Sequence, residues 1–272
     1  MKEITKKISL IIGLFIFLGC STEEDKVKST NLIITFSHTV AGETLVMYPF
    51  GCLDGGYCID GHACCIGGLN YTNSTGEPYN VETLKYLISN IQLHYVNGEK
   101  KVLKEVHFVN VTDASTLTVD LGELDNGEYT KISFTMGLDS SLNIDNRYVN
   151  ESWDAAMEWP MNLGYHYMKL EGAFDTITNG YLTHTGPTMG MDMSFNSSFN
   201  ISLNVDENLG DVNSMIMMEI NNWYQYPNEI SFVSYGPAGN NGIMQNMMMQ
   251  HKLQANGEDV AGGVFTFTTF MQ

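Results

Sequence analysis

The sequence predicts an all-β protein, an antiparallel β-sandwich in a single domain with long loops and few short helices. Apolar side chains recur at every second position in short runs, which is the period of a half-buried strand. The clearest run contains Leu87, Ile91, Leu93 and Tyr95. Clusters of Gly, Asn and Asp separate the runs, and no stretch sustains a helical period. Short strands joined by such turns are typical of a sandwich.

The strands are expected along one domain that spans residues 31–272. Asn97-Gly98 predicts a tight hairpin turn, because both residue types tolerate the left-handed backbone that a twisted hairpin requires. With 43% hydrophobic residues and no detectable repeat, a chain of this length can bury one large core. The expected strands cover residues 32–36, 86–96, 102–109, 116–121, 129–136, 165–170, 200–205, 214–220, 229–235 and 264–270.

The first residues predict a bacterial lipoprotein leader. Three lysines precede an apolar run over residues 8–18, about half the roughly 20 residues that a membrane-spanning helix needs. The run is followed by Gly19-Cys20, which resembles a lipobox. We therefore expect residues 1–19 to be a signal peptide, Cys20 to carry the lipid that anchors the protein to a membrane, and residues 20–30 to form a flexible tether.

Charge and motifs restrict the functional classes. The formal net charge of −18 makes nucleic acid and anionic bilayers poor partners. The sequence contains no nucleophile elbow, no metalloprotease motif, no phosphate-binding glycine loop and no dinucleotide fingerprint. We therefore expect a protein that is not an enzyme.

Four further cysteines lie in one glycine-rich stretch, GCLDGGYCIDGHACCIGG. In an oxidising compartment this even number predicts two disulfides, with three possible pairings. A metal site that uses these thiols with His62 is the alternative, although the spacing lacks the paired C-x-x-C pattern of zinc sites. The disulfide candidates are Cys52, Cys58, Cys64 and Cys65.

The chain is rich in side chains that bind soft metal ions, with seven His and seventeen Met. Imidazole and thioether ligands together suit copper. Three histidines stand on or beside expected strands and could be aimed into a shared site, namely His38, His166 and His184. A histidine on a strand is also an ordinary hydrogen-bonded residue, so this interpretation stays open for each of them.

Two other patterns could bind metal. Met189, Met191 and Met193 alternate, so a strand there would place three thioethers on one face, although Met also fills irregular cores. Oxygen-bearing side chains also alternate over residues 139–145, as in a calcium loop. That segment lacks the central Gly and the terminal Glu of such loops, so calcium is the weaker cofactor candidate.

A set of short segments in a fixed order carries a family resemblance. The segments are Phe36-Ser37-His38, residues 86–93, residues 127–129, residues 132–134, residues 137–140, residues 157–165, residues 169–172 and Thr183-His184-Thr185-Gly186. Together they resemble the MbnP-like copper-binding family of periplasmic and lipid-anchored bacterial proteins. The resemblance covers nearly the whole chain after the leader.

The resemblance implies a β-rich domain that binds copper through histidines. In some members the metal lies beside a tryptophan that a partner di-haem enzyme oxidises to kynurenine. His38 and His184 match the family best, and His166 falls in a matching segment. Trp159 is the tryptophan of the matched motif, where an unmodified buried aromatic is the alternative. The cysteine-rich loop at residues 51–68 is an insertion relative to the family.

These observations predict an envelope lipoprotein that binds a copper ion through His38, His184 and a third group, for copper acquisition or handling. The expected location is the outer membrane of a Gram-negative, Bacteroidetes-like bacterium, on its periplasmic or cell-surface face. Residues 21–26 resemble the acidic export tag of surface lipoproteins in that phylum, or form an ordinary linker.

Two rival hypotheses remain. The first is a metal-free surface adhesion or interaction module stabilised by disulfides, with an aromatic contact patch at residues 223–227. The second is a carbohydrate-processing enzyme that uses paired carboxylates.

Overall fold

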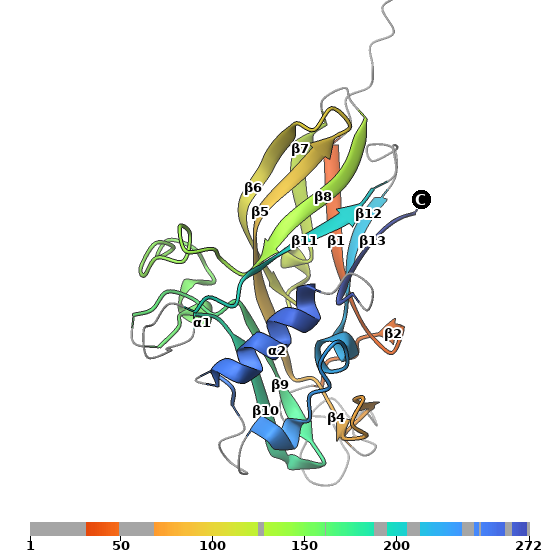
Figure 1. Ribbon diagram of the computed structural model, residues 1–272, viewed down its shortest axis with the longest axis vertical. Helices are drawn as coiled ribbons and strands as arrows, with labels where there is room; N and C mark the ends of the chain where they lie inside the picture. The colour runs from red at the N-terminus through yellow and green to blue at the C-terminus, as the bar shows by residue number, and fades with distance from the viewer. Residues whose placement is uncertain are drawn as a thin grey trace, which may run out of the picture.

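A computed structural model describes residues 31–48, 68–124, 128–160, 162–187, 195–205, 213–235, 242–244, 246–258 and 263–270. Most of these residues lie in two β-sheets that face each other (Figure 1). The expected all-β sandwich is therefore confirmed. The lipidation candidate Cys20, the four disulfide candidates and the three alternating methionines lie outside the described residues.

The first sheet has five strands in the order β13-β12-β1-β2, and β7 also pairs with β1. β1 pairs with β12 in parallel, and every other pair in this sheet is antiparallel. The parallel pair joins the beginning of the domain to its last third, so the sheet forms only after most of the chain is present. The strands are β1 (Asn31–Val40), β2 (Glu43–Thr44), β7 (Thr118–Glu123), β12 (Asn213–Glu219) and β13 (Phe265–Phe270).

The second sheet has eight strands arranged around the long strand β5 (Thr83–Tyr95). The first part of β5 pairs with β9 and its last part with β8, while β6 runs along its other edge. The β5–β6 hairpin turns at Asn97-Gly98 as expected, but only Gly98 has a positive φ, of 89°, so the turn is not of the expected type. The other strands are β3 (Tyr71–Thr72), β4 (Pro78–Tyr79), β6 (Lys100–Asn110), β8 (Tyr129–Met136), β9 (Met168–Phe174), β10 (Thr176–Thr185) and β11 (Phe199–Asn204).

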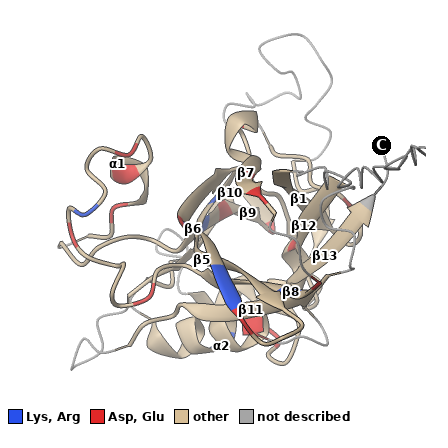
Figure 2. Ribbon diagram, turned by 90° about the horizontal axis from the view of Figure 1, so that it is seen from above, with Lys and Arg blue, Asp and Glu red and all other residues tan. Residues whose placement is uncertain are grey.

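The main core fills the space between the sheets. Alternate residues of β1 point into it, including Phe36 and His38, and they meet Tyr86 from β5. Seen from above, β1, β12 and β13 lie across from β5, β8 and β11, and α2 (Met247–Glu258) lies outside them (Figure 2). Red segments in the same view mark acidic residues on the loop that carries α1 (Asp154–Met157).

A second, smaller core lies on the outer face of the eight-stranded sheet. Leu87 points to this face, whereas its neighbour Tyr86 points to the main core. The segment between β8 and β9 folds over Leu87 and extends away from the sheets (Figure 1). It brings Trp153, Met157 and Tyr165 into the cluster, and Met157 is fully buried. This segment leads directly into the candidate metal centre.

Among the elements that the expected strands did not include are β10 and α2. The pairing of β10 with β9 shifts register between Thr176 and Gly180. The helix α2 has a narrow apolar face, since Met249 and Leu253 enter the main core whereas Met247 and Met248 are exposed; buried amides also hold it in place. Gln250 donates to the carbonyls of residues 184 and 243, and Asn256 to those of residues 223 and 228.

One expected strand is wrong. Residues 229–235 were read as a strand, but η3 (Phe232–Tyr235) is a 3-10 helix. The carboxylate of Glu77 accepts hydrogen bonds from the Ser231 hydroxyl and from the backbone N–H groups of Phe232 and Val233. These bonds come from 154 or more residues away, so no local pattern announces them. The remaining 3-10 helices are η1 (Ala114–Thr116) and η2 (Ile220–Tyr224).

Among the described residues, the helices are too short or too polar to span a lipid bilayer.

We predict that acidification below neutral pH destabilises the fold. Burial lowers the pKa of His38 and of His107 to about 4, below the ordinary value of 6.5. The unfolded chain therefore binds more protons as the pH falls from about 6.5 to about 4, and the free energy of unfolding decreases across that window. Urea unfolding at several pH values measures this change.

A matched variant isolates one contribution. The Nε2–H of His107 donates to the Thr116 carbonyl at 2.9 Å, and Gln at this position offers an N–H that does not titrate. His107→Gln should therefore show a shallower loss between pH 6.5 and 4.5. Equal unfolding free energies of the parent protein at pH 7 and pH 4.5 would contradict the prediction.

Candidate metal centre

Two buried histidines meet where the beginning of β9 lies beside the end of β10. His184 is the second-last residue of β10, and His166 stands two residues before β9. Their ring centroids are 5.0 Å apart and the ring planes are perpendicular. Both side chains are buried, with 5% of His166 and 7% of His184 exposed. The pair is therefore assembled by one antiparallel strand pairing.

Hydrogen bonds fix the tautomer of each ring. The Nδ1–H of His166 donates to the Met157 carbonyl at 3.2 Å, and the Nε2–H of His184 donates to a Glu171 carboxylate oxygen at 2.7 Å. Each remaining nitrogen thus carries a lone pair. His166 Nε2 and His184 Nδ1 are buried without a hydrogen-bond partner among the described residues. Buried nitrogens are usually completed by a water molecule, a ligand or an ion.

Burial keeps His166 uncharged. Burial lowers the pKa of His166 to about 3, and the neighbouring His184 and Lys169 lower it further in the same direction. The imidazole is therefore neutral at any pH at which the protein is expected to work, and its Nε2 lone pair is available. No proton has to be displaced from this ring before it can bind a metal ion.

Trp159 forms the third side of the site. Its ring centroid is 4.7 Å from that of His166, and 2% of the residue is exposed. The backbone N–H of Trp159 donates to the Gly164 carbonyl at 2.7 Å, which closes a hairpin between α1 and β9. The indole packs on Gly186, where an added Cβ would lie 2.5 Å from a ring carbon. Gly186 is thus the residue that lets Trp159 approach the histidine pair.

A carboxylate and an ammonium group lie behind His184. Lys169 Nζ is 3.9 Å from the Glu171 oxygen that accepts from His184. Burial raises the pKa of Glu171, but the hydrogen bonds from His184 and Thr83 and the charge of Lys169 outweigh burial, so the net pKa is lowered. Glu171 therefore stays ionised. Sequence reasoning assigned it no role, because only the β9–β10 register brings it to His184.

His38 lies on the opposite face of the sheet from this pair. Its Nε2 is 3.1 Å from the Tyr86 hydroxyl in the main core. Tyr86 pairs across the sheet with Met168, whereas His184 pairs with the next residue of β9, Lys169. Because side chains alternate between faces along a strand, Tyr86 and His184 point in opposite directions. The structure brings His166 to His184 and leaves His38 on the core side.

The histidine pair fits a metal ion. Metal–imidazole distances of roughly 2.0 Å would place the centroids of two rings that share one ion about 5 to 6 Å apart, and the observed 5.0 Å is compatible with this as well as with an edge-to-face contact of the rings. Metal-bound histidines usually donate their second N–H to a carboxylate or carbonyl, as both do here. Within the described ranges, no three His, Cys, Asp or Glu side chains form a metal-binding group. Two imidazoles with an aromatic neighbour are what the site offers.

The calcium-like segment uses its oxygens within the protein. One Asp139 oxygen accepts from the backbone and hydroxyl of Ser141, and the other accepts from the Asn90 amide. The Asn143 oxygen accepts from the Tyr165 backbone N–H. These bonds shape the loop that covers the second core.

The expected aromatic contact patch is wrong. Trp223 and Tyr224 are 1% and 0% exposed, and only Tyr226 of that patch presents its ring, at 55% exposed. Trp223 packs on Phe199 and Phe265, so these aromatic residues stabilise the core rather than form a contact surface.

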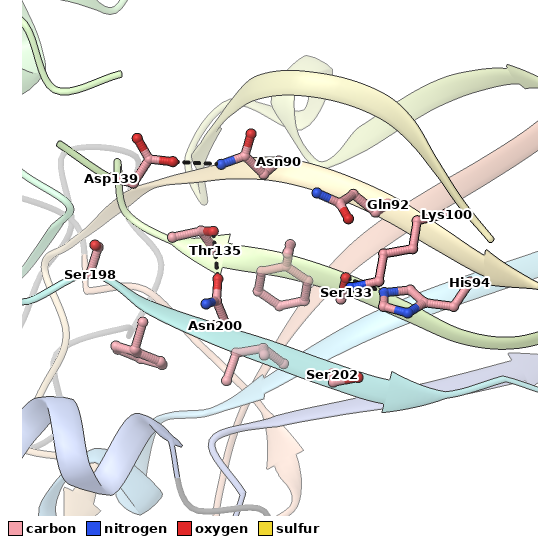
Figure 3. Close-up of a pocket in the computed structure, with 13 residues that line it drawn as sticks. Asn90, Gln92, His94, Lys100, Ser133, Thr135, Asp139, Ser198, Asn200 and Ser202 are labelled. Carbon is pink, nitrogen blue, oxygen red and sulfur yellow. Dashed lines mark hydrogen bonds between the residues drawn. The ribbon is translucent and has the colours of Figure 1, made fainter. Parts of the chain in front are cut away.

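A polar groove of about 410 Å³ lies elsewhere, on the outer face of β5, β8 and β11 (Figure 3). Its side chains largely bond to each other, as in the pairs Thr135–Asn200 and Asn90–Asp139. His94 points into it and is bonded to Ser133 at 2.7 Å. The groove thus holds one histidine and lacks the paired imidazoles of the metal centre.

Comparisons with known proteins agree with this architecture. The model of the MbnP family matches residues 29–248. Among solved structures, MbnP from Methylosinus trichosporium is similar, with a TM-score of 0.53 and 10% identity over 89% of this chain and 99% of that chain. At this identity the likeness shows the fold. A search of curated proteins finds no match.

We predict that Gly186→Ala destabilises the protein by about 1–3 kcal/mol, because the added methyl group overlaps the Trp159 ring. The free energy of unfolding in urea and the near-ultraviolet circular dichroism of the aromatic residues measure the effect. Gly180→Ala in β10 is the control, since its Cβ would approach no atom closer than 3.7 Å. Equal stabilities of the two variants would show that Trp159 does not depend on Gly186.

Proposed function

The chain belongs to the MbnP family, and on that premise we propose that it binds a copper ion at the cell envelope for copper acquisition or handling. The observation that supports this proposal best is the pair of partnerless nitrogens, His166 Nε2 and His184 Nδ1. A bound ion would complete both. His38, which the sequence favoured, is not part of this proposed site.

Copper suits this donor set. Imidazole nitrogens bind copper well, and copper forms the most stable complexes among the common divalent first-row metals. The neutral His166 ring presents its Nε2. The hydrogen bond of His184 Nε2 to Glu171 leaves Nδ1 as the second nitrogen that can bind the ion. The strand pairing holds both rings in place, so little rearrangement is needed on binding. This favours tight binding and storage or transfer of the metal over chemical turnover.

Trp159 is placed for a role beside the metal. Its ring lies 4.7 Å from His166 and it is buried against Gly186. We propose that it corresponds to the tryptophan that a di-haem partner enzyme converts to kynurenine in some family members. Conversion would add an amine and a carbonyl next to the two imidazoles. Mass spectrometry of the peptide that contains Trp159, from cells with and without such a partner, tests this.

We predict that His166→Ala and His184→Ala each weaken copper binding by at least roughly 100-fold, more than the loss of an outer-shell partner usually costs. Each variant leaves one imidazole, which cannot hold the ion alone. Copper titration of the purified protein with a competing chelator measures the affinity, and elemental analysis gives the stoichiometry.

His38→Leu and His94→Ala are the matched controls. His38 lies on the opposite face of the sheet and His94 in the polar groove, so both variants should retain the parent affinity. Loss of copper in His38→Leu with full retention in His184→Ala would reject the site.

The envelope location rests on the leader. We predict that Cys20→Ser abolishes labelling of the protein by a fatty-acid analogue and releases it from the membrane fraction, because the thiol is the acceptor of the lipid. Cys52→Ser, which keeps Cys20, is the control and should remain labelled. Equal labelling of the parent protein and Cys20→Ser would contradict the lipoprotein assignment.

A further inference from the structure

Glu171 is the side chain that holds His184. The two residues stand on neighbouring strands, one step apart diagonally, and the carboxylate accepts the Nε2–H at 2.7 Å. Glu171 is in turn held on both sides. Thr83, its direct partner on β5, bonds to the carboxylate, and Lys169 Nζ lies 3.9 Å away. The carboxylate is therefore a fixed acceptor rather than a mobile surface charge.

The hydrogen bond decides which nitrogen of His184 carries the proton. A neutral imidazole has one N–H, and it stays on Nε2 while Glu171 accepts from that atom. Nδ1 is buried and has no hydrogen-bond partner in the described part of the chain, so nothing there favours a proton on it. If the proton moved to Nδ1, the site would offer a donor where a metal needs a lone pair.

We propose that Glu171 is a positioning residue for the metal centre, which fixes the Nε2–H tautomer of His184 and thereby presents Nδ1 as a ligand. This inference rests on the proposed function, since it assigns a residue that prepares the same site. The negative carboxylate also increases the electron density on the imidazole and strengthens Nδ1 as a donor. The proposal further assigns different ligand atoms to the two rings, Nδ1 of His184 and Nε2 of His166.

The tautomer can be read without any metal. Long-range ¹⁵N–¹H spectra of the purified, metal-free full chain distinguish a protonated from an unprotonated ring nitrogen. We expect the parent protein to show a protonated Nε2 and an unprotonated Nδ1 for His184, assigned by comparison with His184→Ala. A protonated Nδ1 in the parent protein would overturn the proposal, whether or not copper binds.

Three variants separate the acceptor from its charge. Glu171→Gln keeps an oxygen that can accept the Nε2–H but removes the charge, so the tautomer should persist and the copper affinity should fall slightly. Glu171→Leu removes the acceptor, so His184 should become a mixture of tautomers and the affinity should fall roughly 10–100-fold. Glu123→Leu, the same change at an exposed strand end in the other sheet, should behave like the parent protein.

The outcomes distinguish this inference from the proposed function. If Glu171→Leu keeps the parent tautomer and affinity while His184→Ala loses copper, the metal site stands and the role of Glu171 is rejected. If the parent protein binds no copper but shows the expected tautomer, which Glu171→Leu loses, Glu171 positions His184 and the copper function is rejected. Circular dichroism of each variant confirms that it has folded, and Glu171→Gln supplies the answer if Glu171→Leu does not fold.

Discussion

The register between β9 and β10 is the constraint on which the metal centre depends. It pairs His184 with Lys169 and sets Glu171 one diagonal step away, so the histidine, its acceptor and the neighbouring ammonium share one face. Because side chains alternate with a period of two, a slip of one residue would turn His184 into the main core and face Thr183 outwards. Thr183 is bonded there to the hydroxyls of Tyr224 and Tyr235, which oppose such a slip.

The inner face of the eight-stranded sheet packs in the main core, and its outer face carries the smaller core and the candidate metal centre. On the inner face, His38, Tyr86 and Phe36 belong to the core that joins the two sheets. On the outer face, the segment that carries α1 buries its own aromatic cluster and delivers Trp159 and His166 to the end of β10. The candidate metal centre lies where that segment returns to the sheet. Its side chains lie between the two hydrophobic cores and are part of neither.

The sequence was sufficient for the fold class because alternation along β5, β6 and β8 is local information. Local patterns also marked His166 and His184 as candidates, and the family resemblance added Trp159. They could not show which candidates meet, since the choice between His38 and His166 as the partner of His184 depends on sheet faces and on the β9–β10 register. Glu171 lies in the matched segment 169–172, but no local pattern assigned it a role for the same reason. The elements that were not predicted depend on distant contacts as well: Glu77 shapes η3, and buried amides hold α2.

The energetics of the two partnerless nitrogens favour the metal-bound state. A buried polar atom without a hydrogen bond costs about 1–3 kcal/mol relative to one that is paired, and the site contains two of them. Each ring makes one hydrogen bond with its other nitrogen, to the Met157 carbonyl or to Glu171, so only the second nitrogen of each ring carries this cost. An ion that coordinates both nitrogens removes the same cost on binding, and it stabilises the folded state because the unfolded chain does not hold the two rings together. On the proposed function, the cost of the two partnerless nitrogens in the metal-free protein would be recovered when copper binds.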